Sequence, residues 1–210
     1  MCIFTIMIET LLSFALATSI LAISPGPDNI FVLTQSIVNG KTFGLATVIG
    51  LISGCLVHTT LLAFGVSAII STSENLYLGI KIFGSVYLLY LAFKVYKTDT
   101  SILLSKEVIP KKTITQLFKQ GFLMNVLNPK VSIFFLAFFP GFLFSDSLGT
   151  VTQFYILGFI LMFVYLFIFS AIAILAGTIS RSIKNNNKIG LYLKWSQFVV
   201  FLLIAIFILL

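Results

Sequence analysis

The sequence predicts an all-α integral membrane protein, a six-transmembrane-helix bundle whose first and fourth helices are broken. Hydrophobic residues make up 59% of the 210-residue chain and the mean hydropathy is +1.14. Charged residues make up only 9%, against about 25% in soluble domains. The basic residues gather between long apolar segments, and two of these segments are interrupted by proline. This distribution excludes a soluble protein and, despite the net charge of +7, argues against nucleic-acid binding.

Six apolar segments come near the ~20 residues that a helix needs to cross ~30 Å of hydrocarbon. They cover approximately residues 6–38, 43–70, 76–96, 118–144, 151–176 and 191–210. The first segment is long enough for two helices, but its break leaves only a short piece behind it, so we expect one discontinuous span. The N-terminus does not resemble a cleavable signal peptide, because Glu9 stands where positive charge is expected.

The charges predict an orientation through the positive-inside rule. Eleven of the 13 Lys and Arg residues lie in the loops that follow the first, third and fifth segments. The loops on the opposite side carry Glu9, Glu74 and Asp146. We therefore expect a multi-pass membrane protein with both termini extracytoplasmic and the basic loops in the cytoplasm.

The chain is expected to form a single transmembrane domain, residues 1–210. Its halves, 1–97 and 117–210, are joined by a cytoplasmic loop, 98–116. Three spans in each half mean that the second half enters the membrane from the opposite face, and each half opens with a broken helix. This arrangement predicts two inverted three-helix repeats.

The two helix breaks hold the formal charges that lie deepest in the apolar segments. They have the sequences Ser24-Pro25-Gly26-Pro27-Asp28-Asn29 and Asn128-Pro129-Lys130. Asn128 is expected to cap a helix that begins at Pro129, where the missing N–H of proline is not needed. Asp28 suits the positive end of a restarted helix, whereas Lys130 has the wrong sign for one. A charge buried in lipid costs several kcal/mol unless it is paired or solvated. Asp28 and Lys130 are therefore expected to approach each other, directly or through water or substrate.

Opposed charges between broken helices are typical of a small-solute transporter. A zwitterion fits them, with its ammonium group at Asp28 and its carboxylate at Lys130 or at freed backbone N–H groups. The candidate substrate site comprises Pro25, Gly26, Pro27, Asp28, Asn29, Asn125, Asn128, Pro129 and Lys130. Plainer roles stay open: Asp28 as a helix cap, and Lys130 as a lysine that extends to the interface.

The second segment carries Gly50, Gly54 and His58 at intervals of four residues, so they share one helix face. Small residues at this spacing usually indicate close helix packing. His58 is also a candidate proton relay, because imidazole changes its charge near physiological pH.

No hydrolase, P-loop or Cys/His metal motif is found in the sequence, so we expect a protein that is not an enzyme and uses no metal or cofactor. A cation or metal-ion carrier would need several embedded carboxylates or thiolates, but Asp28 alone is deep and Cys55 is isolated. A non-transporting scaffold would not need opposed charges at two breaks. The pattern fits import and export alike.

The chain resembles the LysE/RhtB family of amino-acid exporters in three blocks. They are Ser24–Asn29 with Gly40, Lys41 and Gly44; the segment from Lys81 to Ala92; and Gly121 to Lys130. One departure is Ala92, where the family has glycine. The resemblance implies a proton-motive-force-driven exporter of amino acids or related metabolites in a bacterial inner membrane, with protons and lipid as its other partners. Distant relatives move metal ions, which keeps a cation or metal-ion transporter as the alternative, and a homo-oligomer stays open.

Overall fold

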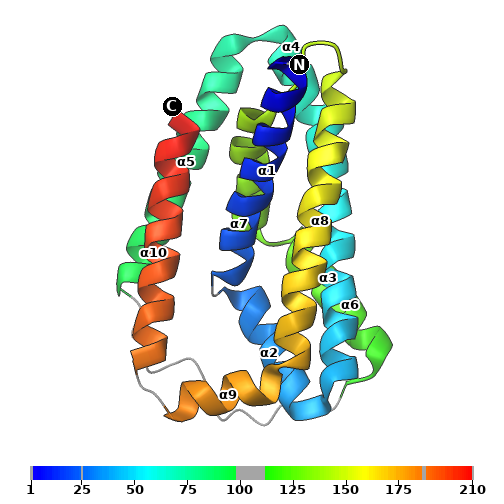
Figure 1. The fold of residues 1–210 in the computed structure, drawn as a ribbon, viewed down its shortest axis with the longest axis vertical. Coiled ribbons are helices and arrows are strands. Elements are labelled where there is room, and N and C mark those ends of the chain that lie inside the picture. The colour runs from blue at the N-terminus through cyan, green and yellow to red at the C-terminus, as the bar shows by residue number, and fades with distance from the viewer. Residues whose placement is uncertain (1, 25, 98–111, 186–187, 210) are drawn as a thin grey trace.

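The computed structural model describes residues 2–24, 26–97, 112–185 and 188–209, which fold into a bundle of helices (Figure 1). In chain order these are α1 (Cys2–Ile23), α2 (Pro27–Asn39), α3 (Lys41–Leu61), α4 (Ser67–Thr72), α5 (Glu74–Lys97), α6 (Ile114–Val126), α7 (Pro129–Phe138), α8 (Thr150–Ile174), α9 (Ala176–Asn185) and α10 (Lys188–Leu209). A π-helical turn, Leu62–Val66, joins α3 to α4, and a 3-10 turn, Phe139–Phe142, follows α7. No strand occurs in the described residues.

Four helical segments are long and apolar enough to cross a membrane by themselves: Lys41–Ile70, α5, α8 and Leu191–Leu209 of α10. The pairs α1/α2 and α6/α7 are bent by 58° and 50° at their breaks, and each pair as a whole is also apolar enough to span. Counting each bent pair as one span gives six. This confirms the predicted six-helix bundle with broken first and fourth helices.

Charge divides the two ends of the bundle as the sequence predicted. Both chain termini lie at one end, the top of Figure 1. The opposite end holds the last turn of α5, the starts of α3, α6 and α10, and α9, which runs across the bundle (Figure 1). These are the elements that carry or flank the basic residues.

The packing of the spans is consistent with an inverted repeat. The second and fifth spans pack on each other, α3 against α8, and so do the third and sixth, α5 against α10. One further pair of contacts exchanges under the same relation, since α3 packs on α6 as α8 packs on α1. Two three-helix halves related by an axis between α3 and α8 would produce this pattern.

Glycine allows α3 and α6 to approach closely. A Cβ added at Gly50 would overlap the backbone carbonyl of Phe118, and one at Gly121 would overlap the backbone carbonyl of Thr47. This confirms the packing interpretation of Gly50. A different glycine requirement occurs at Gly40, which ends α2 with a φ of 99°, a conformation that glycine adopts without strain.

Phenylalanine fills the core around α7. Phe134, Phe135 and Phe138 are each 2% exposed, and Phe14 of α1 packs edge-on to Phe139 with ring centroids 5.0 Å apart. Burial on most sides identifies α7 as the central element of the bundle. Other phenylalanine rings face outward: Phe163 and Phe167 are 73% exposed on the outer surface of α8.

Two features differ from the sequence prediction. Helix α6 begins at Ile114, four residues before the predicted span, because Thr113 and Gln116 form a capping box. Residues 177–185, which we expected to lie in a basic loop, belong to the amphipathic helix α9. Most of the predicted loop 98–116 lies outside the described residues, and so do positions 186 and 187 of the predicted basic loop before the last span.

Candidate functional site

The second break is formed by Pro129. Its ring nitrogen has no proton to donate to the Asn125 carbonyl four residues earlier, so α6 ends there. Two other nitrogen atoms contact the Asn125 carbonyl oxygen instead. They are the backbone nitrogen of Asn128, at 3.0 Å, and Nε2 of His58, at 3.1 Å. The Asn128 side chain then caps α7, because its Oδ1 accepts the Lys130 N–H at 3.1 Å. The predicted N-cap and first helical residue are confirmed.

The first break has its own cap. The Asn29 amide, which lies in the first turn of α2, donates to the Ala22 carbonyl at the end of α1 over 2.8 Å. Gly26 is extended, with φ −149° and ψ 176°, and precedes Pro27, the first residue of α2. Asp28 therefore lies in the first helical turn, where the helix dipole favours an anion. The predicted site residue Pro25 lies outside the described residues.

The two breaks meet through one amide. Nδ2 of Asn128 donates to Oδ2 of Asp28 across 3.5 Å, a long hydrogen bond between residues 100 positions apart. A cavity of about 30 Å³ lies at this junction. Of the predicted site residues, six line it: Gly26, Pro27, Asp28, Asn29, Asn128 and Lys130.

The charged groups of the cavity are not fully paired. Among the described residues, Oδ1 of Asp28 and the hydroxyl of Ser24 are buried and find no hydrogen-bond partner. The Lys130 ammonium nitrogen lies 4.6 Å from the centre of the Phe201 ring. Within the described part of the chain, Asp28 and Lys130 share the cavity but form no direct ion pair. The site thus has unused capacity to bind a polar ligand.

The electrostatic field of the cavity combines opposite signs. Helices α2 and α7 both begin at it, so two positive helix ends and the Lys130 ammonium group face one carboxylate. Helix N-termini bind carboxylates readily, and a carboxylate binds ammonium groups. The arrangement is suited to a small ligand that carries both charges.

Three predicted residues do not line the cavity. Pro129 is exposed and only shapes the break. The Asn125 side chain is 1% exposed, and its amide nitrogen and oxygen have no hydrogen-bond partner. His58 is 5% exposed, contacts the Asn125 carbonyl and packs on the Phe135 ring at 5.3 Å. The structure thus gives His58 a capping function, and its predicted proton-relay role stays a prediction.

Several residues that line the cavity were not among the predicted site residues. Ser24 belongs to the first break, and its position before the prolines was the available signal. Tyr165 and Phe169 come from α8, one turn apart on the same face. Nothing local distinguishes them from other aromatic residues of that helix.

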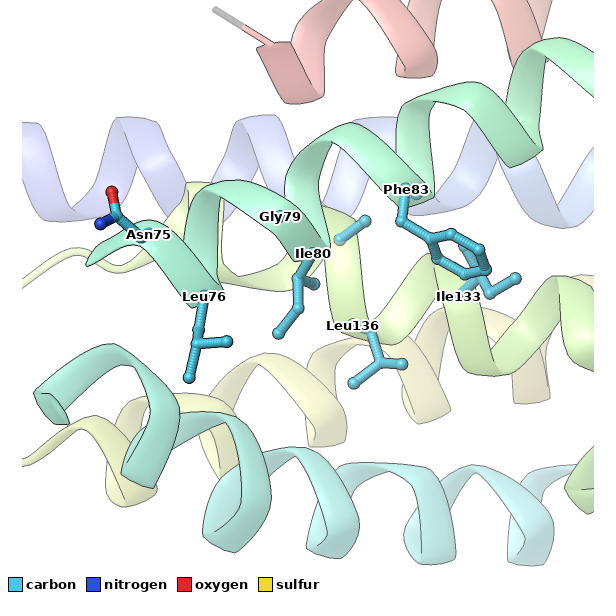
Figure 2. A pocket seen from close by; sticks show the side chains of 9 residues that line it. Asn75, Leu76, Gly79, Ile80, Phe83, Ile133 and Leu136 are labelled. Carbon is cyan, nitrogen blue, oxygen red and sulfur yellow. The ribbon is translucent and has the colours of Figure 1, made fainter. Parts of the chain in front are cut away.

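A larger groove lies elsewhere, between α5 and α7. It has a volume of about 300 Å³, and Figure 2 shows Leu76, Ile80 and Phe83 of α5 beside Ile133 and Leu136 of α7. Of the described residues that line it, Asn75 has the one polar side chain and none is charged. It lacks the groups that recognise a zwitterion, so the smaller cavity at the breaks is the candidate site.

Six spans with a charged cavity where two broken helices meet define a multi-pass membrane protein of the transporter class. The family model described as LysE type translocator matches residues 19–210. The chain therefore belongs to the LysE type translocator family, which confirms the resemblance found in its sequence.

Curated relatives extend this finding. The homoserine/homoserine lactone efflux proteins of Salmonella typhimurium and Salmonella typhi are each 28% identical over 84% of this chain and 84% of their own length. An uncharacterized membrane protein of Bacillus subtilis, YrhP, is 29% identical over 64% of this chain and 68% of its own. No solved structure matches the chain.

Proposed function

We propose that the protein is a secondary active exporter of amino acids or closely related small metabolites, coupled to proton antiport. The observation that supports this most directly is the single cavity lined by Asp28 and Lys130 at the starts of two helices. A zwitterion matches this pattern of charge. Homoserine, the substrate in the names of two relatives, has an ammonium group, a carboxylate and a short hydroxyl side chain.

Each part of such a substrate has a partner in the cavity. Its ammonium group binds Asp28, whose Oδ1 is buried without a hydrogen-bond partner. Its carboxylate binds the Lys130 ammonium group and the backbone N–H groups where α2 and α7 begin. A side-chain hydroxyl binds Ser24, the second unpartnered group of the cavity.

Proton coupling is assigned to Asp28. The substrate enters from the cytoplasm, and the two halves then move relative to each other and open the cavity to the outside. A proton from outside neutralises the carboxylate and releases the ammonium group. The protonated carrier returns and loses its proton in the cytoplasm. The basic end of the bundle is assigned to the cytoplasm, and both termini to the outside, on the positive-inside rule.

The alternative, a cation or metal-ion carrier, has less support. The described residues contain no group of three or more His, Cys, Asp or Glu side chains that could hold a metal ion. A metal would also have to share the cavity with the Lys130 ammonium group. No specific feature of the cavity favours this function.

Reconstituted vesicles test the proposal. Purified protein in liposomes with an imposed pH gradient should drive radiolabelled homoserine against its concentration gradient. Asp28→Asn keeps the size and hydrogen-bonding capacity of the side chain but removes its charge and its proton. We expect it to insert normally and to lose gradient-driven transport.

Asp146→Asn, in the loop before α8, is the matched control and should transport as the unaltered protein does. Full gradient-coupled transport by Asp28→Asn would remove Asp28 from the mechanism and leave it as a helix cap. Failure of the unaltered protein to move homoserine or any other amino acid would refute the proposed function itself.

A further inference from the structure

None of the described residues that line the charged cavity belongs to α10, but Phe201 of α10 contacts the cavity residue Lys130. The ammonium nitrogen of Lys130 lies 4.6 Å from the centre of the Phe201 ring. Phe201 is 1% exposed, so this contact is shielded from the surroundings. Ammonium groups within about 6 Å of a ring centroid are attracted by the electron-rich face, most strongly where water is excluded.

The opposite side of the ammonium group is also defined. A Cβ added at Gly26 would lie 3.3 Å from the Lys130 nitrogen, which is tighter than ordinary contact. Glycine therefore leaves just enough room for the ammonium group between the first break and the Phe201 ring. The Lys130 ammonium group is thus held between Gly26 and the Phe201 ring, although the Asp28 carboxylate lines the same cavity.

We propose that Phe201 is a positioning residue that holds the Lys130 ammonium group away from Asp28 while the carrier is empty. This inference rests on the proposed function. In the empty carrier the ring provides a partner for the lysine, and Asp28 stays available for the ammonium group of the substrate. When the substrate binds, its carboxylate replaces the ring as the partner of Lys130.

Loss of the ring's attraction should let Lys130 pair with Asp28. The lysine would then compete with the substrate ammonium group for one carboxylate. Competition of this kind raises the KM of transport and leaves kcat nearly unchanged, because the substrate displaces the lysine once it is bound. A purely structural role for Phe201 predicts a different result, in which stability and kcat fall together.

A fluorination series separates these roles. Replacing Phe201 by mono-, di- and trifluorophenylalanine withdraws electron density from the ring face in steps and nearly preserves its size. The matched control is the same series at Phe207, on the same helix, whose ring lies 5.1 Å from that of Phe142. Homoserine transport in proteoliposomes gives KM and kcat, and heat denaturation gives the stability of each variant.

We expect the KM to rise with each fluorine at position 201, by about tenfold for the trifluorinated ring, with unchanged stability. The Phe207 series should leave the KM unchanged. A KM that does not respond at position 201, in protein whose coupling is still abolished by Asp28→Asn, would overturn the role of Phe201 and leave the proposed function intact. If the unaltered protein moves no homoserine or other amino acid, both fall together.

Discussion

Gly54 tests how tightly α3 holds the end of α6. A Cβ placed there by Gly54→Ala would lie 2.7 Å from both Cβ and Oδ1 of Asn125, where ordinary contact begins at 3.4 Å. The Asn125 Cβ is fixed to the α6 backbone, so rotation of the side chain cannot relieve the contact. The last turn of α6 must move, and the hydrogen bond between His58 and the Asn125 carbonyl must lengthen with it. Inserting a methyl group into packing of this kind costs about 1–3 kcal/mol, and rigid neighbours on both sides place the expected loss at about 2 kcal/mol.

Heat denaturation in detergent measures this loss, with folded protein followed by size-exclusion chromatography after each temperature step. A loss of about 2 kcal/mol lowers the Tm of a chain of this size by roughly 5 °C. The control is Gly79→Ala in α5, where an added Cβ would meet no atom within 4 Å and better helix propensity should keep or raise the Tm. Equal Tm values for the two variants would refute the close packing of α3 on α6. Asn125→Gly should rescue Gly54→Ala, because it removes the atoms that collide.

Three other predictions concern the site and the topology. Gly26→Ala should slow homoserine transport about threefold, because the added methyl group would crowd the Lys130 ammonium group. The protein should still fold, since the extended backbone at this position accepts alanine. An unchanged transport rate would show that the ammonium group is free to move. His58→Ala should lower the stability measured by heat denaturation by about 1–3 kcal/mol, since it removes a hydrogen bond to a buried carbonyl. His58→Gln should restore part of that stability and retain transport. Loss of proton coupling in folded His58→Gln protein would favour the proton-relay role. On a background without the N-terminal cysteine, a membrane-impermeant maleimide should label Ser147→Cys in intact cells and Thr115→Cys only after permeabilisation; the reverse pattern would invert the proposed orientation.

The architecture was predictable because it depends on long-range properties of the chain. Length and apolarity determine which segments can span, and the basic residues at one end follow from the alternation of loops. The breaks were predictable from Pro27 and Pro129, since proline cannot donate the backbone hydrogen bond that would continue the preceding helix. The cap at Asn128 followed from its position directly before that proline.

The features that could not be predicted depend on contacts between segments that are distant in the sequence. The hydrogen bond from Asn128 to Asp28 could not be predicted, because an amide can cap its own helix and also donate to another segment. Phe201 is one of 23 phenylalanines, and only the folded position of Lys130 distinguishes it from the others. Helix α9 was missed because its basic residues and short length are typical of a loop, whereas its amphipathic pattern becomes stable only when one face packs against the bundle.

The size of the charged cavity has a consequence for the energy supply of a cell. A volume of about 30 Å³ accommodates about one or two water molecules, so an amino acid can enter the cavity only when the surrounding helices move apart. One or two water molecules cover only a small part of the ~30 Å of hydrocarbon, so the cavity alone does not supply a continuous chain of water along which protons could cross without substrate. The resting protein would therefore insulate the membrane, and an exporter of this construction would draw on the proton gradient only during turnover.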